Sequence, residues 1–529
     1  MGTATIPLHD AAFLIEGLSD PAAYQHPVRD VRVHQTHSSI VFLAGDFAYK
    51  IKKPVKYEFL DYSHLDVRLY FCQEEIRLNA VICPDVYLDV VPVTERDGRL
   101  TMGGEGEPVE WAVRMRRLRE EDMLSNRLST GSVDDQDIER IAQFVANLHA
   151  RAFRDPIDEE YGTPDNIEET IAMACELMEN MGGDAGHKGV IRRYLTDFIA
   201  DHRHILWERT RADRIRDCHG DLRVQNICLD RRFGNGVQLF DCIEFSKDLR
   251  FIDTAADIAF LAMDLDLAGR TNLRKLLIDT YGAHMEDDDL RTLLPFYQTY
   301  RAVVRGNIAM LASKEAEVDI ADRTQHLTMA GAAHDLARCY AGRRSQPALI
   351  ITVGYSGTGK SVLAHELARR LPAIQLSSDE IRPLVPRSGD RYSGEARARV
   401  YDALRRQAAK HLADGTHVIL DATFLAEDER AKCQHLAETL GVEFWSIICN
   451  CPDSVIRNRI EERQYIASRT LSEAGIGVYE SQVREFPTIK AAPVASHLPG
   501  GTITVDTSQP VDKAAAQVID KFLAISRQP

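Results

Sequence analysis

The residues best suited to chemistry in the first part of the chain lie in the segment HGDLRVQN at 219–226. Its spacing is H-x-D-x-x-x-x-N, and a short strand ending in Asp241 follows after a Gly-Asn-Gly turn. Phosphoryl transfer needs a base beside the acceptor hydroxyl and oxygen ligands for Mg²⁺. We therefore predict that Asp221 is the base and that His219 braces the loop. Asn226 and Asp241 are the predicted metal ligands.

A lysine on an early strand and a glutamate on the next helix should complete such a site. We predict that Lys50, in AGDFAYKIKK, binds the nucleotide phosphates and that Glu75, in the helix that follows, is its ion-pair partner. Lys52, Lys53 and Glu74 compete for these roles. The lysines after position 50 are alternatively a solvated charge run.

A second set of phosphate-binding residues lies in the last third of the chain. The segment GYSGTGKS at 354–361 fits G-x-x-x-x-G-K-[ST], follows the apolar strand ALIITV and opens the helix VLAHELARRL. Lys360 should reach the β- and γ-phosphates, and Ser361 should bind Mg²⁺. The residues expected to cradle phosphate oxygens with their backbone are Gly354, Ser356, Gly357, Thr358 and Gly359. The alternative is a plain glycine turn before a helix.

The strand HVILDAT, which ends in an acidic residue, helps to distinguish a kinase from a motor ATPase. Asp421 is placed to hold Mg²⁺, but Ala422 stands where a motor ATPase usually has a glutamate, so a kinase is favoured. Asp379, in SSDEIR at the end of AIQL, should face the ligand crevice and accept the proton of the acceptor hydroxyl. Arg382 would bind an anionic group of the substrate. The alternative for Asp379 is a helix N-cap.

Four arginines cluster in VIRNRIEERQYIASR, after the strand end ICNCP. They are Arg457, Arg459, Arg463 and Arg469. On a closing lid, arginines neutralise charge on the transferred phosphoryl group, and we predict this role for Arg463 and Arg469. The glutamates at 461–462 favour ordinary surface ion pairs as the alternative.

The elements that must position these residues change character along the chain. Short extended segments and one helix up to residue 118 predict a small sheet plus a helix, and residues 119–340 are mostly helical around the strand block at 219–245. AGRRSQP at 341–347 is the predicted linker. From 348 to 529, β-branched runs alternate with helices, which predicts an α/β domain with a mostly parallel sheet.

Composition excludes several classes of protein. A length of 529 residues predicts about three folding units, and 44% hydrophobic with 27% charged residues is typical of soluble globular proteins. The net charge of −16 disfavours non-specific binding to nucleic acid or anionic membranes, although a local basic groove remains open. Ten cysteines are too sparse for a disulfide scaffold. Without a visible signal peptide or membrane span, we expect a cytoplasmic location.

Residues 25–340 resemble the aminoglycoside phosphotransferase family in AYKIK, QEEIRLN, HGDLRVQN and LFDCIEF…DTAADIAF. The resemblance implies an α+β bilobal protein-kinase-like fold, with lobes at 1–118 and 119–340. It places Met115 near the adenine, unless that side chain is plain core, and makes Asp257 a brace for the catalytic loop. THSS at 36–39 replaces the usual glycine-rich loop. Arg223 stands where antibiotic kinases commonly have histidine, so the aminoglycoside name is not taken as the substrate.

Residues 346–529 resemble the P-loop small-molecule and polynucleotide kinases, a group that includes gluconate kinase and zeta-toxin-type kinases. The segments that carry the resemblance are GYSGTGKS, SSDEIR, VILDAT, RNRIEER…R and ITVDTS. Nearly the whole chain resembles bacterial tandem proteins that join an aminoglycoside phosphotransferase-like domain to a P-loop or AAA-type ATP-binding domain.

These observations predict a bifunctional, ATP- and Mg²⁺-dependent phosphotransferase whose two modules each transfer a γ-phosphoryl group to a hydroxyl of a small molecule. Two alternatives remain. One module senses nucleotide and regulates the other, or the C-terminal module is a polynucleotide end kinase, which the negative charge disfavours. The sequence does not identify the acceptors, the oligomeric state or the preference for ATP over GTP.

Overall fold

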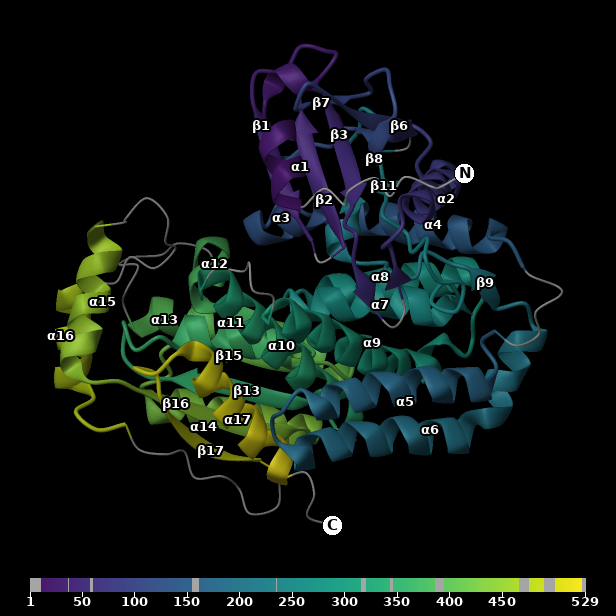
Figure 1. Ribbon diagram of the computed structural model, residues 1–529. Coiled ribbons are helices and arrows are strands. Elements are labelled where there is room, and N and C mark those ends of the chain that lie inside the picture. The colour runs from purple at the N-terminus through teal and green to yellow at the C-terminus, as the bar shows by residue number, and fades with distance from the viewer. Residues whose placement is uncertain are drawn as a thin grey trace. The chain divides into compact units, whose positions relative to one another are not determined.

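The structure is a computed structural model. It describes residues 11–36, 38–57, 60–154, 161–234, 236–314, 320–342, 346–385, 394–465, 475–489 and 500–525. The chain forms two compact units, whose elements are labelled in Figure 1. The first comprises Met1–Ile167, His202–Leu261 and Leu276–Leu294, and the second comprises Glu168–Asp201, Ala262–Lys275 and Pro295–Pro529.

The first unit begins with a six-stranded antiparallel sheet in the order β1-β2-β3-β8-β6-β7. Its strands are β1 (Val31–Gln35), β2 (Ser39–Ala44), β3 (Phe47–Lys52), β6 (Tyr87–Arg96), β7 (Arg99–Met102) and β8 (Pro108–Arg116). The short helix α1 (Ala11–Leu18) and the small hairpin of β4 (Lys56–Tyr57) and β5 (Leu60–Asp61) accompany the sheet. Lys50 pairs with Val41 on one side and Val113 on the other, so it lies on an interior strand.

Helix α2 (Leu65–Ile82) presents one buried face at helical spacing. That face carries Arg68, Cys72, Glu75 and Asn79. Cys72 packs in an apolar cluster with Ala48 of the sheet. Because residues three and four apart lie on the same side of a helix, this packing also aims Glu75 toward β3.

Helices and two short hairpins follow the sheet. The helices are α3 (Leu124–Thr130), α4 (Asp135–Arg151), α5 (Pro164–Asn180), α6 (Ala185–Arg211), α7 (Thr254–Leu267), α8 (Thr271–Met285), α9 (Leu290–Ala312) and α10 (Ile320–Ala341). One hairpin pairs β10 (Ile227–Cys228) with β11 (Gln238–Leu239), and the other pairs β9 (Ile215–Asp217) with β12 (Phe251–Asp253). A sheet-rich part followed by a mostly helical part confirms the predicted α+β, protein-kinase-like class.

The C-terminal part contains a five-stranded, fully parallel sheet in the order β14-β15-β13-β16-β17. The strands are β13 (Ala348–Val353), β14 (Ala373–Ser377), β15 (His417–Asp421), β16 (Glu443–Asn450) and β17 (Gly500–Asp506). The helices are α11 (Lys360–Arg370), α12 (Ser378–Ile381), α13 (Gly394–Ala413), α14 (Glu427–Leu440), α15 (Asp453–Tyr465), α16 (Ile476–Glu485) and α17 (Val511–Ile525). Every residue of the central strand β13 is buried, as expected for a parallel sheet covered on both faces. The predicted α/β P-loop class is confirmed.

Within the second unit, α10 packs against α11 and α17. The guanidinium of Arg370, near the end of α11, pairs with Glu366 of its own helix at 2.6 Å and with Asp335 of α10 at 2.8 Å. Arg338 of α10 pairs with Asp520 of α17 at 2.9 Å. These ion pairs connect the last helix before the predicted linker to the parallel-sheet domain.

Among the described helices, none combines the length and the apolar character needed to cross a bilayer.

Candidate active sites

Lys50 lies between two carboxylates in the first unit. Its Nζ donates to Glu75 Oε1 at 2.9 Å and also pairs with Asp241. Burial by itself lowers the pKa of Lys50, but the carboxylates of Asp241 and Glu75 raise it above the ordinary value. Three residues predicted from separate segments, for the nucleotide, the ion pair and the metal, therefore meet at one point.

The competing residues take other places. Lys52 Nζ donates to the second oxygen of the same carboxylate, Glu75 Oε2, at 2.7 Å, and it also pairs with Glu244. Glu74 pairs instead with Arg77 on an exposed face of α2, at 2.7 Å. Glu75 thus forms ion pairs with both buried lysines, which was not predicted from the sequence.

The segment that carries Asp241 is fixed by backbone hydrogen bonds. Asp241 has a φ of 62°, a left-handed conformation that non-glycine residues seldom adopt. Its N–H donates to Tyr87 Oη at 3.1 Å, and the N–H of Cys242 donates to Asn79 Oδ1 at 3.1 Å. Strained backbone persists where surrounding contacts determine it, and such sites are often functional.

The catalytic loop brings the predicted base and metal ligand together. The amide nitrogen of Asn226 donates to the Asp221 backbone oxygen at 2.9 Å and to Asp221 Oδ2 at 3.0 Å. Arg223 reaches both carboxylate oxygens, with Nη2 2.8 Å from Oδ2 and Nε 2.7 Å from Oδ1. Burial raises the pKa of Asp221, but Arg223 and His219 lower it below the ordinary value, so the carboxylate is ionised as a base requires.

The carboxylate of Asp257 holds the backbone of this loop in place. Its carboxylate accepts from the N–H groups of His219 and Gly220, each at 3.0 Å, and contacts His149 Nε2 at 3.1 Å. His219 Nε2 lies 2.9 Å from the carbonyl oxygen of Phe240, so the loop is tied to the strand before Asp241. His149 was not identified from the sequence, because no spacing rule relates α4 to residues 108 positions later.

Met115, near the end of β8, is buried with Ala48 of β3, and Leu118 packs at the edge of the same apolar cluster. This packing fits both an adenine-side residue and plain core, so the adenine role of Met115 stays a prediction.

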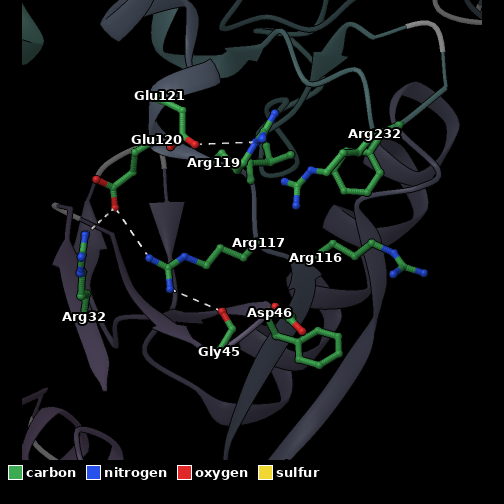
Figure 2. A pocket seen from close by; sticks show the side chains of 12 residues that line it. Arg32, Gly45, Asp46, Arg116, Arg117, Arg119, Glu120, Glu121 and Arg232 are labelled. Atoms are coloured by element: carbon green, nitrogen blue, oxygen red, sulfur yellow. Dashed lines mark hydrogen bonds and ion pairs between the residues drawn. The ribbon is translucent and has the colours of Figure 1, made fainter. Parts of the chain in front are cut away.

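The segment after β8 also borders a pocket of about 670 Å³ (Figure 2). Its charged lining consists of Arg32, Arg116, Arg117, Arg119, Arg232, Asp46, Glu120 and Glu121. Four of the five arginines pair with nearby carboxylates, for example Arg32 with Glu120 at 3.1 Å and Arg232 with the buried Asp230 at 2.5 Å. Because most of its charge is neutralised in this way, the pocket does not resemble a phosphate cradle.

In the second unit, the loop between β13 and α11 needs glycine at defined positions. Gly354 has a φ of 156°, and a Cβ there would lie 2.9 Å from the carbonyl oxygen of Cys449. Gly357 has a φ of 87°, and a Cβ there would lie 2.9 Å from Ile456 of α15. The loop closes on Lys360, whose Nζ donates to the Tyr355 carbonyl oxygen at 2.6 Å. Burial lowers the pKa of Lys360.

The predicted metal ligands and base of this unit lie together. Burial raises the pKa of Asp421 above its ordinary value, the nearby Asp379 adds to this rise, and the Ser361 hydroxyl, which lies near the Asp421 carboxylate, opposes it. Asp379 is not the N-cap of α12, because Ser377 holds that position and accepts from the Asp379 N–H at 3.3 Å. Arg382 lies 3.8 Å from Asp379 Oδ1.

The arginines of α15 divide by helix face. Arg463 lies near Lys360 and contributes to lowering its pKa. Arg459, which the sequence reasoning did not favour, donates to the Thr507 carbonyl oxygen at 2.7 Å and lies beside Gly359 of the loop. Arg457 pairs with Asp453 and Glu480 on an exposed face, and Arg469 lies outside the described residues. The spacing of Ile456, Arg459, Ile460 and Arg463 marks one helix face and is the signal that would have identified Arg459.

Helix α16 contacts the same loop. Gln482 Oε1 accepts from the Ser356 N–H at 2.8 Å, and Gln482 Nε2 donates to Ser356 Oγ at 3.1 Å. Thr358 is bound from the other side, because its carbonyl oxygen accepts from the Thr507 hydroxyl at 2.6 Å. No motif in the sequence pointed to Gln482.

The oxygen donors of both sites fit Mg²⁺, which prefers carboxylate, hydroxyl and amide oxygens. In the first site, the side-chain nitrogen of Asn226 donates to Asp221, so the side-chain oxygen Oδ1 would be the Asn226 ligand for a cation that Asp241 also binds. The Asp241 side chain is 43% exposed and so is open to ligands. In the second site, Ser361 and Asp421 supply a hydroxyl and a carboxylate.

Comparison with known proteins gives relatives for both parts of the chain. Residues 349–487 match the AAA domain family. The uncharacterized proteins Rv2004c of Mycobacterium tuberculosis and Mb2027c of Mycobacterium bovis are each 31% identical over 472 residues, which is 84% of this chain and 89% of theirs.

Solved structures with similarity include kinases. A choline/ethanolamine kinase family protein of Mesorhizobium loti is 15% identical, with 60% of this chain and 94% of that chain covered and a TM-score of 0.36. The APS kinase of Mycobacterium tuberculosis is 21% identical, with 34% and 99% covered and a TM-score of 0.25. A gluconokinase of Sinorhizobium meliloti is 19% identical, with 34% and 94% covered and a TM-score of 0.25.

The sheet orders and the AAA domain match support a protein-kinase-like half followed by a P-loop half. Both halves have kinase-like folds. The chain belongs to the family of the mycobacterial proteins Rv2004c and Mb2027c, here a kinase-like fold joined to an AAA-family P-loop domain.

Proposed function

We propose that the protein is a bifunctional phosphotransferase, in which each module transfers the γ-phosphoryl group of ATP to a hydroxyl of a small molecule. The observation that supports this proposal is that each unit contributes, from its own residues, a buried or half-buried lysine, oxygen-bearing side chains suited to Mg²⁺ and a carboxylate suited to act as a base. A module that only sensed nucleotide would not need the base. A cytoplasmic location, where ATP is available, is part of the proposal.

In the kinase-like module, Lys50 binds the nucleotide phosphates while Glu75 orients it. Mg²⁺, held by Asn226 and Asp241, would neutralise charge on the phosphates. Asp221 accepts the proton of the acceptor hydroxyl, and its lowered pKa keeps it ionised for that step.

In the P-loop module, Lys360 and the loop backbone bind the phosphates, and Ser361 with Asp421 would hold Mg²⁺. Asp379 takes the proton of the acceptor. Arg463, from the face of α15 that meets the loop, neutralises charge that develops on the transferred group.

Both bases have an arginine beside them. Arg223 lies 2.8 Å from Asp221, and Arg382 lies 3.8 Å from Asp379. Because each arginine offsets the negative charge of the base beside it, the site does not offer a cationic acceptor an unpaired carboxylate. We therefore expect acceptors that carry a negative or neutral group near the reacting hydroxyl, in contrast to aminoglycosides.

The test is phosphate transfer from γ-labelled ATP into a pool of metabolites and oligonucleotides, with the wild type and the Asp221→Asn and Asp379→Asn variants. Each variant should lose one labelled product and keep nucleotide binding, whereas Lys50→Ala and Lys360→Ala should each remove one of two binding events in calorimetry. Retention of both products in the Asp variants would refute the proposal. A labelled oligonucleotide that depends on Asp379 would identify the P-loop module as an end kinase.

A further inference from the structure

A second buried lysine, Lys52, lies beside the one that binds nucleotide. Its side chain is only 1% exposed, and its Nζ donates to Glu75 Oε2 at 2.7 Å and pairs with Glu244. Tyr62 Oη donates to Glu244 Oε1 at 2.6 Å. A buried lysine that is paired on two sides has a defined orientation, because moving it would leave uncompensated charges away from water.

Glu244 belongs to the segment that carries Asp241. In this segment the N–H groups of Asp241 and Cys242 donate to Tyr87 and Asn79, and the N–H of Ile243 donates to the His219 carbonyl oxygen at 3.1 Å. The Glu244 side chain then pairs with Lys52. Four consecutive residues are thus anchored, and the last anchor is the ion pair that reaches back to β3.

The two lysines differ in what catalysis requires of them. Lys50 contacts Asp241 here, but in a working site Lys50 has to bind phosphate while Asp241 faces Mg²⁺. During that exchange Glu75, which is fully buried, would share Lys50 with the phosphates. Lys52 needs to make no such exchange, because both of its partners are protein carboxylates.

We propose that the Lys52 and Glu244 pair is a positioning device. It holds the metal-binding segment 241–244 and the Glu75 carboxylate in place while Lys50 moves from Asp241 to the nucleotide. Neither residue touches the reacting atoms. The inference rests on the proposed function of the kinase-like module and names the residues that keep its metal site assembled.

The test uses the paired variant Lys52→Met with Glu244→Gln, which removes both charges together and leaves neither of them unpaired in the interior. Lys56→Met is the matched control, since Lys56 forms a similar ion pair with Asp61 but is 73% exposed. All proteins carry Lys360→Ala, so that calorimetry with ADP reports the kinase-like site alone. The two readouts are the Mg²⁺ concentration at half-saturation of ADP binding and the amide hydrogen exchange of residues 238–245 without ligands.

In the paired variant we expect half-saturating Mg²⁺ to rise at least tenfold and exchange in 238–245 to accelerate at least tenfold, with exchange in α4 unchanged. The control should match the parent protein in both. If the paired variant folds and both readouts stay within twofold of the parent protein, the pair does not position the metal-binding segment and the proposal is wrong.

Tyr62→Phe decides the matter if the paired variant does not fold. It deletes only the hydroxyl that donates to Glu244, and a two- to fivefold rise in half-saturating Mg²⁺ supports positioning, whereas no change refutes it. Hydrogen exchange needs no nucleotide, so it tests the positioning device even if Lys50→Ala shows that ATP binds elsewhere.

Discussion

Alanine at position 357 should disable the P-loop site and leave the kinase-like site unchanged. Gly357 has a φ of 87°, and an added Cβ would lie 2.9 Å from Ile456 and 3.0 Å from Ile460 of α15. The left-handed conformation costs a non-glycine residue about 1–2 kcal/mol, and forcing a methyl group into packed side chains costs about 1–3 kcal/mol more. The loop must therefore shift, or α15 must move away with its arginines.

Gly441→Ala is the matched control, a left-handed glycine in the same unit but outside the loop. Gly441 ends α14 with a φ of 65°, and no described atom would lie within 4 Å of its added Cβ. This variant carries the conformational cost without the clash. If the clash at position 357 distorts the loop away from the conformation that binds nucleotide, its cost of about 1–3 kcal/mol corresponds to roughly 5- to 150-fold weaker nucleotide binding.

The assay is calorimetry with ADP in a Lys50→Ala background, so that the P-loop site is the one observed. Gly357→Ala should weaken binding within that range, and Gly441→Ala should not change it. Equal affinities for the two variants would refute the conclusion that α15 packs against the loop closely enough to determine its shape.

Three further variants test single contacts. Arg223→Met removes a positive charge that lowers the pKa of Asp221, so burial should then raise this pKa. The acidic limb of the kcat/KM profile should shift to higher pH. An unshifted limb would contradict the conclusion that Arg223 controls the ionisation of the base. Gln482→Ala removes two hydrogen bonds to Ser356, worth about 0.5–1.5 kcal/mol each, and should speed hydrogen exchange in α16 but not in α4. Arg209→Met leaves two buried aspartates without their shared partner and should destabilise the first unit by about 3–5 kcal/mol in thermal unfolding, whereas a loss under 1 kcal/mol would contradict the buried ion-pair network.

The P-loop half was the more predictable from sequence. Its lysine, hydroxyl and glycines are contiguous, and the strand before them and the helix after them follow from local patterns. Asp379 and Asp421 follow because strand ends of a parallel sheet meet at one edge. Arg459 and Gln482 were missed, since their roles depend on how α15 and α16 pack on the loop.

The kinase-like half shows where such reasoning ends. The order of the motifs along the chain predicted roles for Lys50 and Asp241. It did not predict their contact, because these residues lie 191 positions apart. Nothing local distinguished Lys50 from Lys52, because alternate positions on a strand share one face. In the structure both lysines pair with Glu75 and differ in their second partner. Lys50 pairs with Asp241, and Lys52 pairs with Glu244.

The predicted linker at 341–347 joins parts of the chain that are also bound to each other within the second unit. Lys360 begins α11, at the end that we propose binds phosphate, and Arg370, the last residue of α11, is 2% exposed and paired with Asp335 of α10. A helix fixed at its far end by a buried ion pair cannot shift at its phosphate end without disturbing that pair or bending. A movement of α11 on nucleotide binding would therefore have to bend the helix, disturb its contact with α10, or move α10, which precedes the linker, together with α11.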